Sequence, residues 1–432
     1  MSTAIPPSAP DGRASAARVL RRWKLWIAPG VLSALVTLVL SLLYMGGILT
    51  PSESLDRLPI AVVNSDAGAP LPGQQTNLGT QVAAAVSGGT PEGQVEWRQL
   101  DRAAAQDQLD SGKVYGALLV PEDFTATVAG LTTTQATVRP ALTVLTNPGM
   151  GSLGSSLASQ ITQKAARQVS VTVGQQLTAS QALAGAAPTT KLLLADPVEV
   201  RTQVGHPIGA RTGLGLSAFY YTLLLVLAGF LCANIVHSGV DTALGYADTE
   251  IGPWHTRRPT LPISRTKTLV IKMVMTAGLS VLTTSLIMFA TITILGMDAP
   301  HGVLLWLFSY CACLSVGLGV QAINAAFGSI GQLVAMFVFI ALALPSSGAT
   351  VPLEAVPGFY RFLAVFEPMR QLASGVRSIL YFDARADAGL TRGWIMIGIG
   401  LVVGVVFGFA MTRYYDRKGL DRMVPAPGPH PA

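Results

Sequence analysis

The sequence predicts an α-helical integral membrane protein with six transmembrane helices and an α/β domain inserted between the first helix and the second. Half of the 432 residues are hydrophobic and only 12% are charged, which is typical of membrane proteins. Five charge-free windows are long enough to cross a bilayer, since one crossing needs about 20 apolar residues. They are Leu25–Ser52, Thr212–Val240, Met273–Met297, Ala299–Leu353 and Gly393–Thr412.

The spacing of these windows predicts the domain organisation. The first window stands alone, and the others follow a long stretch of mostly soluble character. The fourth window is about twice the length of one crossing, so we expect two helices with a turn at Asn324–Gln332. The expected segments are a cytoplasmic tail at 1–24, a transmembrane helix at 25–49, an extracytoplasmic α/β domain at 50–211, a five-helix transmembrane domain at 212–412 and a cytoplasmic tail at 413–432.

Basic residues gather in the N-terminal tail, in the loop at 237–272 and in the C-terminal tail. Because cytoplasmic loops of membrane proteins are enriched in Lys and Arg, this pattern predicts that both termini are cytoplasmic. The first window then acts as an uncleaved signal anchor, and the chain is a multi-pass protein of the cell (plasma) membrane, in contact with the lipid bilayer. Topology accounts for the positive charge, so we do not expect a nucleic-acid partner.

The stretch at 50–211 alternates between predicted strands and helices, which favours an α/β layer with mainly parallel strands. Strands are expected at 58–64, 95–100, 114–120, 141–146 and 198–204. Helices are expected near 78–86 and 101–109, from Pro121 onward and over 151–187.

Catalytic patterns are missing from this stretch. It contains one histidine, His206, no cysteine, and neither a G-x-S-x-G nor an H-E-x-x-H motif. Its carboxylates lie mostly at predicted helix starts, where they offset the helix dipole. We therefore expect no enzyme activity and no catalytic, cofactor or metal site.

The sequence also indicates how transport could be powered. Gly112-Lys113 is followed by Val114, and no P-loop motif occurs in the chain. The predicted spans hold no ionisable residue at their centre, where ion-coupled carriers usually place one. Polar candidates for a translocation path are Asn234, Gln321 and Asn324, although a role in helix packing or in a turn is the favoured interpretation of these residues. Energy for any transport would come from a partner.

The outer segment at 346–392 carries hydrophobic residues at helical spacing, with arginines toward the other side. One interpretation is an amphipathic helix in the outer interface, with arginines extending into the headgroups. The alternative is an ordinary packed surface helix. Its candidate residues are Arg361, Glu367, Arg370 and Arg377.

Three strings carry a resemblance to a known family. Leu58-Pro-Ile-Ala-Val-Val-Asn-Ser-Asp-Ala-Gly68 opens the α/β domain, and Val114-Tyr-Gly-Ala-Leu-Leu-Val-Pro-Glu-Asp-Phe124 lies within it. Ser346-Ser-Gly-Ala-Thr-Val-Pro-Leu-Glu-Ala-Val-Pro357 precedes Phe366-Glu-Pro-Met369 and Gly375-Val-Arg377. Together with the 1 + 5 layout, they resemble the YhgE/Pip-like branch of the type-2 ABC-transporter permease superfamily. Fungal nitrosoguanidine-resistance membrane proteins share a similar layout, so that branch stays open.

This resemblance implies a homodimeric permease that couples to a separate cytoplasmic ABC ATPase through the first cytoplasmic loop. Leu261-Pro-Ile-Ser-Arg265 resembles the family's stretch before the third helix, and Glu250 holds roughly the place of its acidic residue. The candidate coupling residues are Glu250, Arg257, Arg258, Pro262, Arg265 and Lys267. A basic anchor at the membrane surface is the competing interpretation of this loop.

Two functions are therefore expected. The first is the permease subunit of an exporter for a hydrophobic or amphipathic compound, powered by an ATPase in trans. The second is a non-transporting envelope protein whose extracytoplasmic domain binds or scaffolds a partner.

Overall fold

The structure is a computed structural model that describes residues 24–71, 74–131, 138–179, 194–256, 258–420 and 422. The chain divides into two units, at residues 1–46 and 47–432. The described part of the first unit is the helix α2, Lys24–Gly46, with Pro29 inside it. Its stretch Pro29–Gly46 is apolar enough to cross a membrane.

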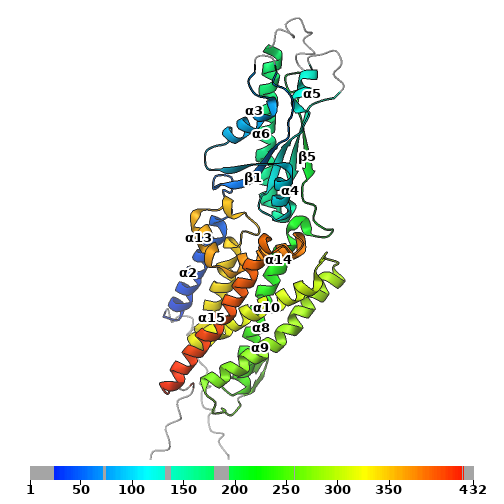
Figure 1. Ribbon diagram of the computed structural model, residues 1–432. Helices are drawn as coiled ribbons and strands as arrows, with labels where there is room; N and C mark the ends of the chain where they lie inside the picture. Colours follow the sequence, from blue (N-terminus) through cyan, green and yellow to red (C-terminus); the bar gives the residue numbers. More distant parts are fainter. Residues whose placement is uncertain are drawn as a thin grey trace, which may run out of the picture. The chain divides into compact units, whose positions relative to one another are not determined.

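A five-stranded mixed sheet forms the centre of the α/β domain (Figure 1). Its strand order is β2-β1-β3-β4-β5, and only the β3–β4 pair is antiparallel. The expectation of mainly parallel strands is therefore confirmed, with one exception. The strands are β1 Leu58–Asn64, β2 Val95–Leu100, β3 Gly116–Val120, β4 Ala141–Thr146 and β5 Glu199–Val204.

Helices cover both faces of this sheet. Alternation along β1 sends Val62 to the face covered by α3, Leu78–Gly88, and α6, Ser152–Ala179. Ala61 and Val63 point to the opposite face, where α4, Arg102–Asp110, packs. The short helix α5, Phe124–Gly130, adds Phe124 and Val128 to the first core. The expected helix over 151–187 is described only to Ala179, and the rest lies outside the described residues.

Among the described residues, four further stretches are long and apolar enough to cross a membrane: Ser217–Ala243, Arg265–Ile294, Gly302–Ser346 and Leu390–Arg417. The first is α8, and the last is α15. The second comprises α9, Arg265–Met288, and a π-helical turn, Phe289–Ile294. The helix α10, Gly302–Phe327, contacts α8, α9 and α15 and lies at the centre of this bundle.

The stretch Gly302–Ser346 folds back on itself near the expected turn. Gly328 adopts φ 62° and ψ −130°, a backbone conformation that favours glycine. Beyond it follow α11, Gly331–Met336, a π-helical turn, Phe337–Ala341, and α12, Ala343–Ser346. A Cβ at Gly319 would lie 2.7 Å from the Phe339 ring, so the arms on either side of the turn pack together.

The expectation of one amphipathic helix in the outer segment is wrong. The chain forms α13, Gly358–Phe366, and α14, Pro368–Tyr381, which are separated at Glu367. Proline disfavours a helical conformation in the preceding residue, and Glu367 is extended, with φ −79° and ψ 123°. The helix α14 buries Leu372, Val376 and Ile379 in the core of the membrane helices, as the packed-helix alternative predicts.

Candidate functional site

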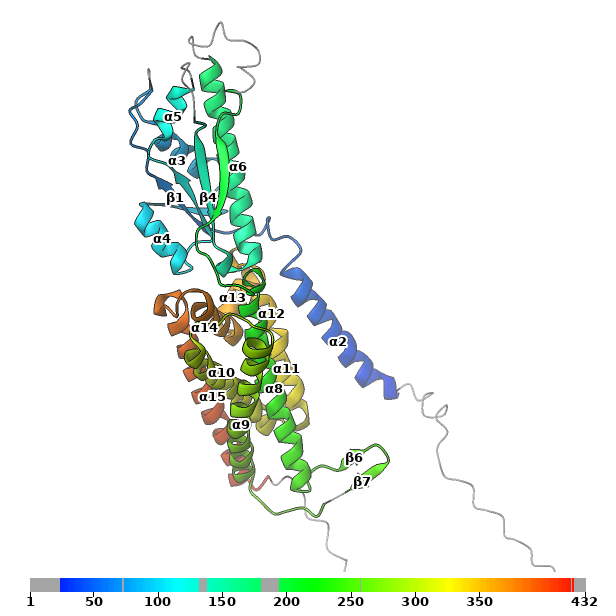
Figure 2. The same ribbon diagram turned by 90° about the vertical axis from the view of Figure 1, so that its right-hand side faces the viewer.

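The loop after α8 contains a β-hairpin, β6 Thr249–Ile251 and β7 Trp254–Thr256. Figure 2 shows it at the end of the helices that lies away from the α/β domain. Trp254 is 74% exposed. Of the predicted coupling residues, Arg258, Pro262 and Lys267 are exposed. Glu250 lies on β6 opposite His255, and Arg257 lies outside the described residues.

Arg265 makes intrachain contacts instead. Its backbone N–H and that of Thr266 donate to the two carboxylate oxygens of Asp416, at 2.9 and 3.0 Å. Its Nε donates to the Leu420 carbonyl at 2.7 Å, and its guanidinium lies 5.1 Å from the centre of the Tyr415 ring. Arg265 therefore joins the start of α9 to the end of α15.

A buried ion cluster lies where α8 enters this loop, and the sequence analysis did not identify it. Asp241 accepts from Lys272 Nζ at 2.7 Å and from both terminal nitrogens of Arg422, at 2.5 and 2.7 Å. His237 Nδ1 lies 3.0 Å from Lys272 Nζ. Asp241 is the first residue after the charge-free window, and His237 lies four residues before it. This pair of ionisable residues is the sequence signal that could have revealed the cluster. The cluster ties the C-terminal segment to α8 and α9.

The three residues predicted to line a translocation path do come together. Gln321 Nε2 donates to the Ala233 carbonyl at 2.8 Å and to Thr276 Oγ1 at 3.0 Å. Asn324 Nδ2 donates to Asn234 Oδ1 at 3.0 Å. Gln321 and Asn324 are 0% and 1% exposed. Their hydrogen bonds join α8, α9 and α10, an arrangement suited to helix packing.

The outer segment and the α/β domain meet through polar contacts that use the resemblance-bearing strings. Tyr115 Oη donates to Glu354 Oε2 at 2.9 Å, and the Asp56 backbone N–H donates to the Glu354 carbonyl at 2.7 Å. The burial of Tyr115 and the nearby Glu354 carboxylate raise the pKa of that phenol well above its usual value. Arg361 pairs with Asp56 at 3.0 Å. These contacts hold the two parts of the second unit together.

A cavity of about 240 Å³ lies at this junction. It is lined from the α/β domain, from the loop after α12, and from α14 and α15. Its charged lining residues are Arg98, Lys113, Glu354, Arg370, Arg377 and Arg392. Of these, the sequence analysis singled out only Arg370 and Arg377 as candidates, because Glu354 and Arg392 flank the predicted amphipathic helix and Arg98 and Lys113 are distant in the sequence.

Positive charge dominates the cavity. Lys113 pairs with Asp387 at 2.6 Å and Arg98 with Glu96 at 2.8 Å. Within the described ranges, the other three arginines have no carboxylate within 4.0 Å. Burial lowers the pKa of Arg370, and the charge of Arg392 lowers it further. Burial also lowers the pKa of Arg377. The cavity is thus suited to an anion.

A second, apolar cavity of about 280 Å³ lies between α10, the turn Phe337–Ala341 and α15, and Phe366, Pro368 and Leu372 complete its wall. Most of its lining is aliphatic or aromatic. It therefore offers a surface for a hydrocarbon chain.

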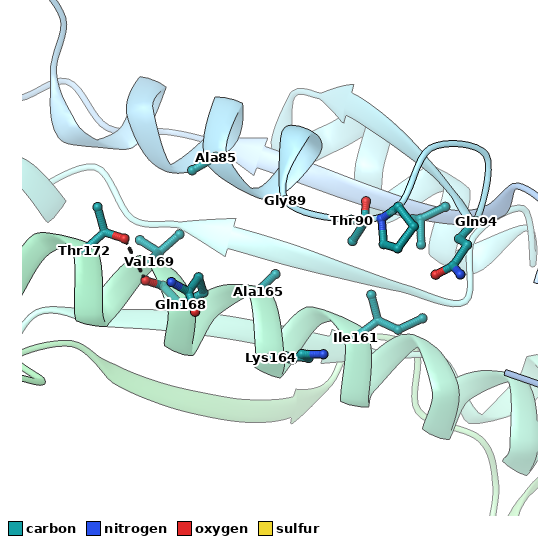
Figure 3. A pocket seen from close by; sticks show the side chains of 12 residues that line it. Ala85, Gly89, Thr90, Gln94, Ile161, Lys164, Ala165, Gln168, Val169 and Thr172 are labelled. Atoms are coloured by element: carbon teal, nitrogen blue, oxygen red, sulfur yellow. Dashed lines mark hydrogen bonds between the residues drawn. The ribbon is translucent and has the colours of Figure 1, made fainter. Parts of the chain in front are cut away.

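A third cavity of about 310 Å³ lies within the α/β domain (Figure 3). Ala85 and Gly89, at the end of α3, face the α6 residues Ala165 and Val169 across it. Lys164 is the one charged residue among its lining residues. Fewer polar groups therefore converge in this cavity than in the basic cavity, and such groups define a specific site.

Comparisons with known proteins identify a family but not an activity. Among solved structures, a domain from Thermotoga maritima MSB8, provisionally assigned to an ABC type-2 transporter, is similar at a TM-score of 0.25 and 13% identity. That match covers 34% of this chain and 84% of the domain and is too weak to inform fold or function. No curated protein matches the chain. A model of the family described as "Protein of unknown function (DUF3533)" matches residues 30–400. Because this match spans most of the sequence, the chain belongs to the DUF3533 family.

Proposed function

We propose that the chain is the membrane subunit of an exporter that moves an amphipathic compound out of the cell, driven by a separate cytoplasmic ATPase. The observation that carries the proposal is the path of α8. This helix follows the last strand of the α/β domain and ends at the exposed hairpin loop. A displacement of the loop would therefore be transmitted along α8 to the connecting segment that joins this helix to the α/β domain.

Six crossings and two cytoplasmic termini complete the proposal. The folded-back stretch Gly302–Ser346 would supply two of the six crossings. The hairpin loop would then face the cytoplasm, where an ATPase could bind it, and the α/β domain would lie outside. A homodimer would supply the second half of the pathway.

Co-purification from native membranes tests this proposal. The full-length chain should recover a P-loop ATPase subunit, and the double variant Arg258→Ala, Lys267→Ala should recover about thirtyfold less, since each of the two charges lost at a contact costs about 1 kcal/mol. Arg201→Ala is the matched control, because Arg201 is an exposed arginine on β5. Recovery of no ATPase, together with efflux of fluorescent amphiphiles that persists in ATP-depleted cells, would overturn the proposal.

A scaffolding role is the second candidate. The cavity between α3 and α6 lacks converging charged groups, but it is a concave surface of the α/β domain into which a partner's side chain could insert. In that case, deletion of the gene would leave the cellular accumulation of amphiphiles unchanged. The full chain would instead recover an envelope protein, and Ala165→Trp, which fills the cavity, would abolish that recovery.

A further inference from the structure

The basic cavity and the apolar cavity lie along one stripe of α15. Arg392 lines the basic cavity, whereas Met396, Ile399, Gly400 and Val403 line the apolar one. These residues recur at the spacing of one helix face. At about 1.5 Å of rise per residue, the stripe runs roughly 16 Å from Arg392 to Val403.

The helix α14 borders both cavities and turns a different face to each. Arg370, Ser374 and Arg377 line the basic cavity. Pro368, which precedes these residues in the sequence, and Leu372, which lies among them, line the apolar cavity. A ligand extending along α15 past α14 would therefore meet cationic groups at one end and hydrocarbon surface at the other.

Three of the four arginines that line the basic cavity, Arg370, Arg377 and Arg392, have unused capacity for an anion. Arg377 donates from one terminal nitrogen to the Ala349 carbonyl at 2.9 Å, but its Nε is buried without a partner among the described residues. Within the part of the chain that the structure describes, the Arg370 guanidinium donates only to the Ala364 backbone carbonyl, at 3.4 Å. Glu354 is the single carboxylate of the lining, and it accepts from Tyr115. Arg392 is exposed and Arg370 is partly buried, so the cost of an unmet donor falls mainly on the buried Nε of Arg377. An anionic oxygen in the cavity would accept from that donor.

We infer that the two cavities together bind one anionic amphiphile. Its phosphate or carboxylate headgroup contacts Arg370, Arg377 and Arg392, and its hydrocarbon chain follows the α15 stripe through the apolar cavity. This inference rests on the proposed function, because it names the class of compound that the exporter would carry. The binding itself requires no ATPase, so the two can fail separately.

Binding of hexadecyl phosphate to the purified full-length chain in nonionic detergent tests the inference. Hexadecyl phosphate should raise the melting temperature, while hexadecanol and inorganic phosphate, which supply only the chain or only the headgroup, should each raise it much less. Palmitate distinguishes the two headgroup sources: a shift equal to that of hexadecyl phosphate indicates that a carboxylate suffices, and a smaller shift indicates a phosphate site.

Two variants separate the subsites. The double variant Arg370→Gln, Arg392→Gln should weaken hexadecyl phosphate binding about tenfold or more, because charge-assisted hydrogen bonds are lost. Arg413→Gln, an exposed arginine on the same helix outside both cavities, should bind normally. Ile399→Trp should block the hydrocarbon chain, and Val402→Trp, at an exposed neighbour that does not line the cavity, should not.

Equal shifts with hexadecyl phosphate and hexadecanol, or unchanged affinity in both cavity variants, would overturn the inference. If binding fails while an ATPase is still recovered from membranes, only the ligand class is wrong. If binding holds and no ATPase is recovered, the site binds an anionic amphiphile without the proposed export.

Discussion

At the scale of single residues, the string that opens the α/β domain is explained by one buried carboxylate. Asp66 is 8% exposed and accepts from the backbone N–H groups of Gly68, Gly79 and Thr125, at 3.1, 2.9 and 3.1 Å. The Thr125 hydroxyl also donates to it. Asp66 thereby fixes the end of β1 to the starts of α3 and α5. Its role is structural, because its acceptor positions are occupied by the chain itself.

The contact around Gly79 is tight enough to exclude a side chain. A Cβ there would lie 2.4 Å from both Asn64 Oδ1 and Asp66 Cβ. We expect Gly79→Ala to lower the free energy of unfolding of the full-length protein by about 1–3 kcal/mol, the usual range for overpacking. Gly88→Ala, on the same helix with open space around it, is the control for thermal unfolding. Equal melting temperatures in the two variants would contradict this account.

Glu367 makes stability dependent on pH. Burial raises its pKa to about 8, while the backbone N–H groups of Arg370 and Met369 act in the opposite direction. The folded state holds the Glu367 proton more tightly than the unfolded state does. The stabilisation that results is therefore fully present below the ordinary pKa of 4.5, and it is lost as the pH rises toward 8. We expect the melting temperature to fall over this range in the wild type.

The variant Glu367→Gln tests this dependence. The amide cannot ionise, so the variant should be the more stable of the two above pH 8, and its melting temperature should fall less between pH 4.5 and 8. Glu96→Gln, a half-exposed carboxylate on β2, is the control. A wild-type profile that matches the Glu367→Gln profile would refute the assignment.

At the scale of the elements, helix packing in the bundle depends on close approach between α10 and α15. A Cβ at Gly404 would lie 3.1 Å from the Gly319 backbone nitrogen. Small residues at such crossings let helix backbones meet in membranes, where van der Waals packing replaces the hydrophobic effect. The cavity that borders these helices depends on the same crossing, since both glycines line it.

Gly404→Val should separate α10 from α15. We expect a destabilised protein that elutes increasingly as aggregate in size-exclusion chromatography after heating, with a cost of about 1–3 kcal/mol. The same substitution at Gly398, which has open space around it on the same helix, should leave the elution profile unchanged. Matching profiles for the two variants would show that the crossing tolerates a side chain.

The elements differ in how far the sequence could predict them. The strands of the α/β domain follow their predicted ranges within two residues, because short apolar runs between turn residues are local signals. The hydrophobic pattern does not reveal the break at Glu367, because hydrophobic positions continue at helical spacing through Pro368. The restriction that Pro368 places on the residue before it is the one local signal of the break. The basic cavity was largely unpredictable, since Lys113 and Arg392 lie far apart in the sequence and only the tertiary fold brings them together.

At the scale of the whole molecule, the proposed orientation can be tested by labelling. In a variant with Cys232, Cys311 and Cys313 replaced by serine, a cysteine at Ala103 should react with an impermeant maleimide in intact cells. One at Thr256 should react only after permeabilisation. Both positions are exposed, so accessibility depends on the side of the membrane. Labelling of the cysteine at position 256 in intact cells would show that the orientation is opposite to the proposed one.

The pairing of Asp241 with Arg422 has a consequence for how the end of α8 is held. Both cations that pair with this carboxylate come from other elements, Lys272 from α9 and Arg422 from the segment after α15. A ligand or protein that binds the Arg422 guanidinium would therefore leave Lys272 to neutralise the Asp241 carboxylate. Binding at the segment after α15 would thus act, through one ionic contact, on the helix that leads into the hairpin loop.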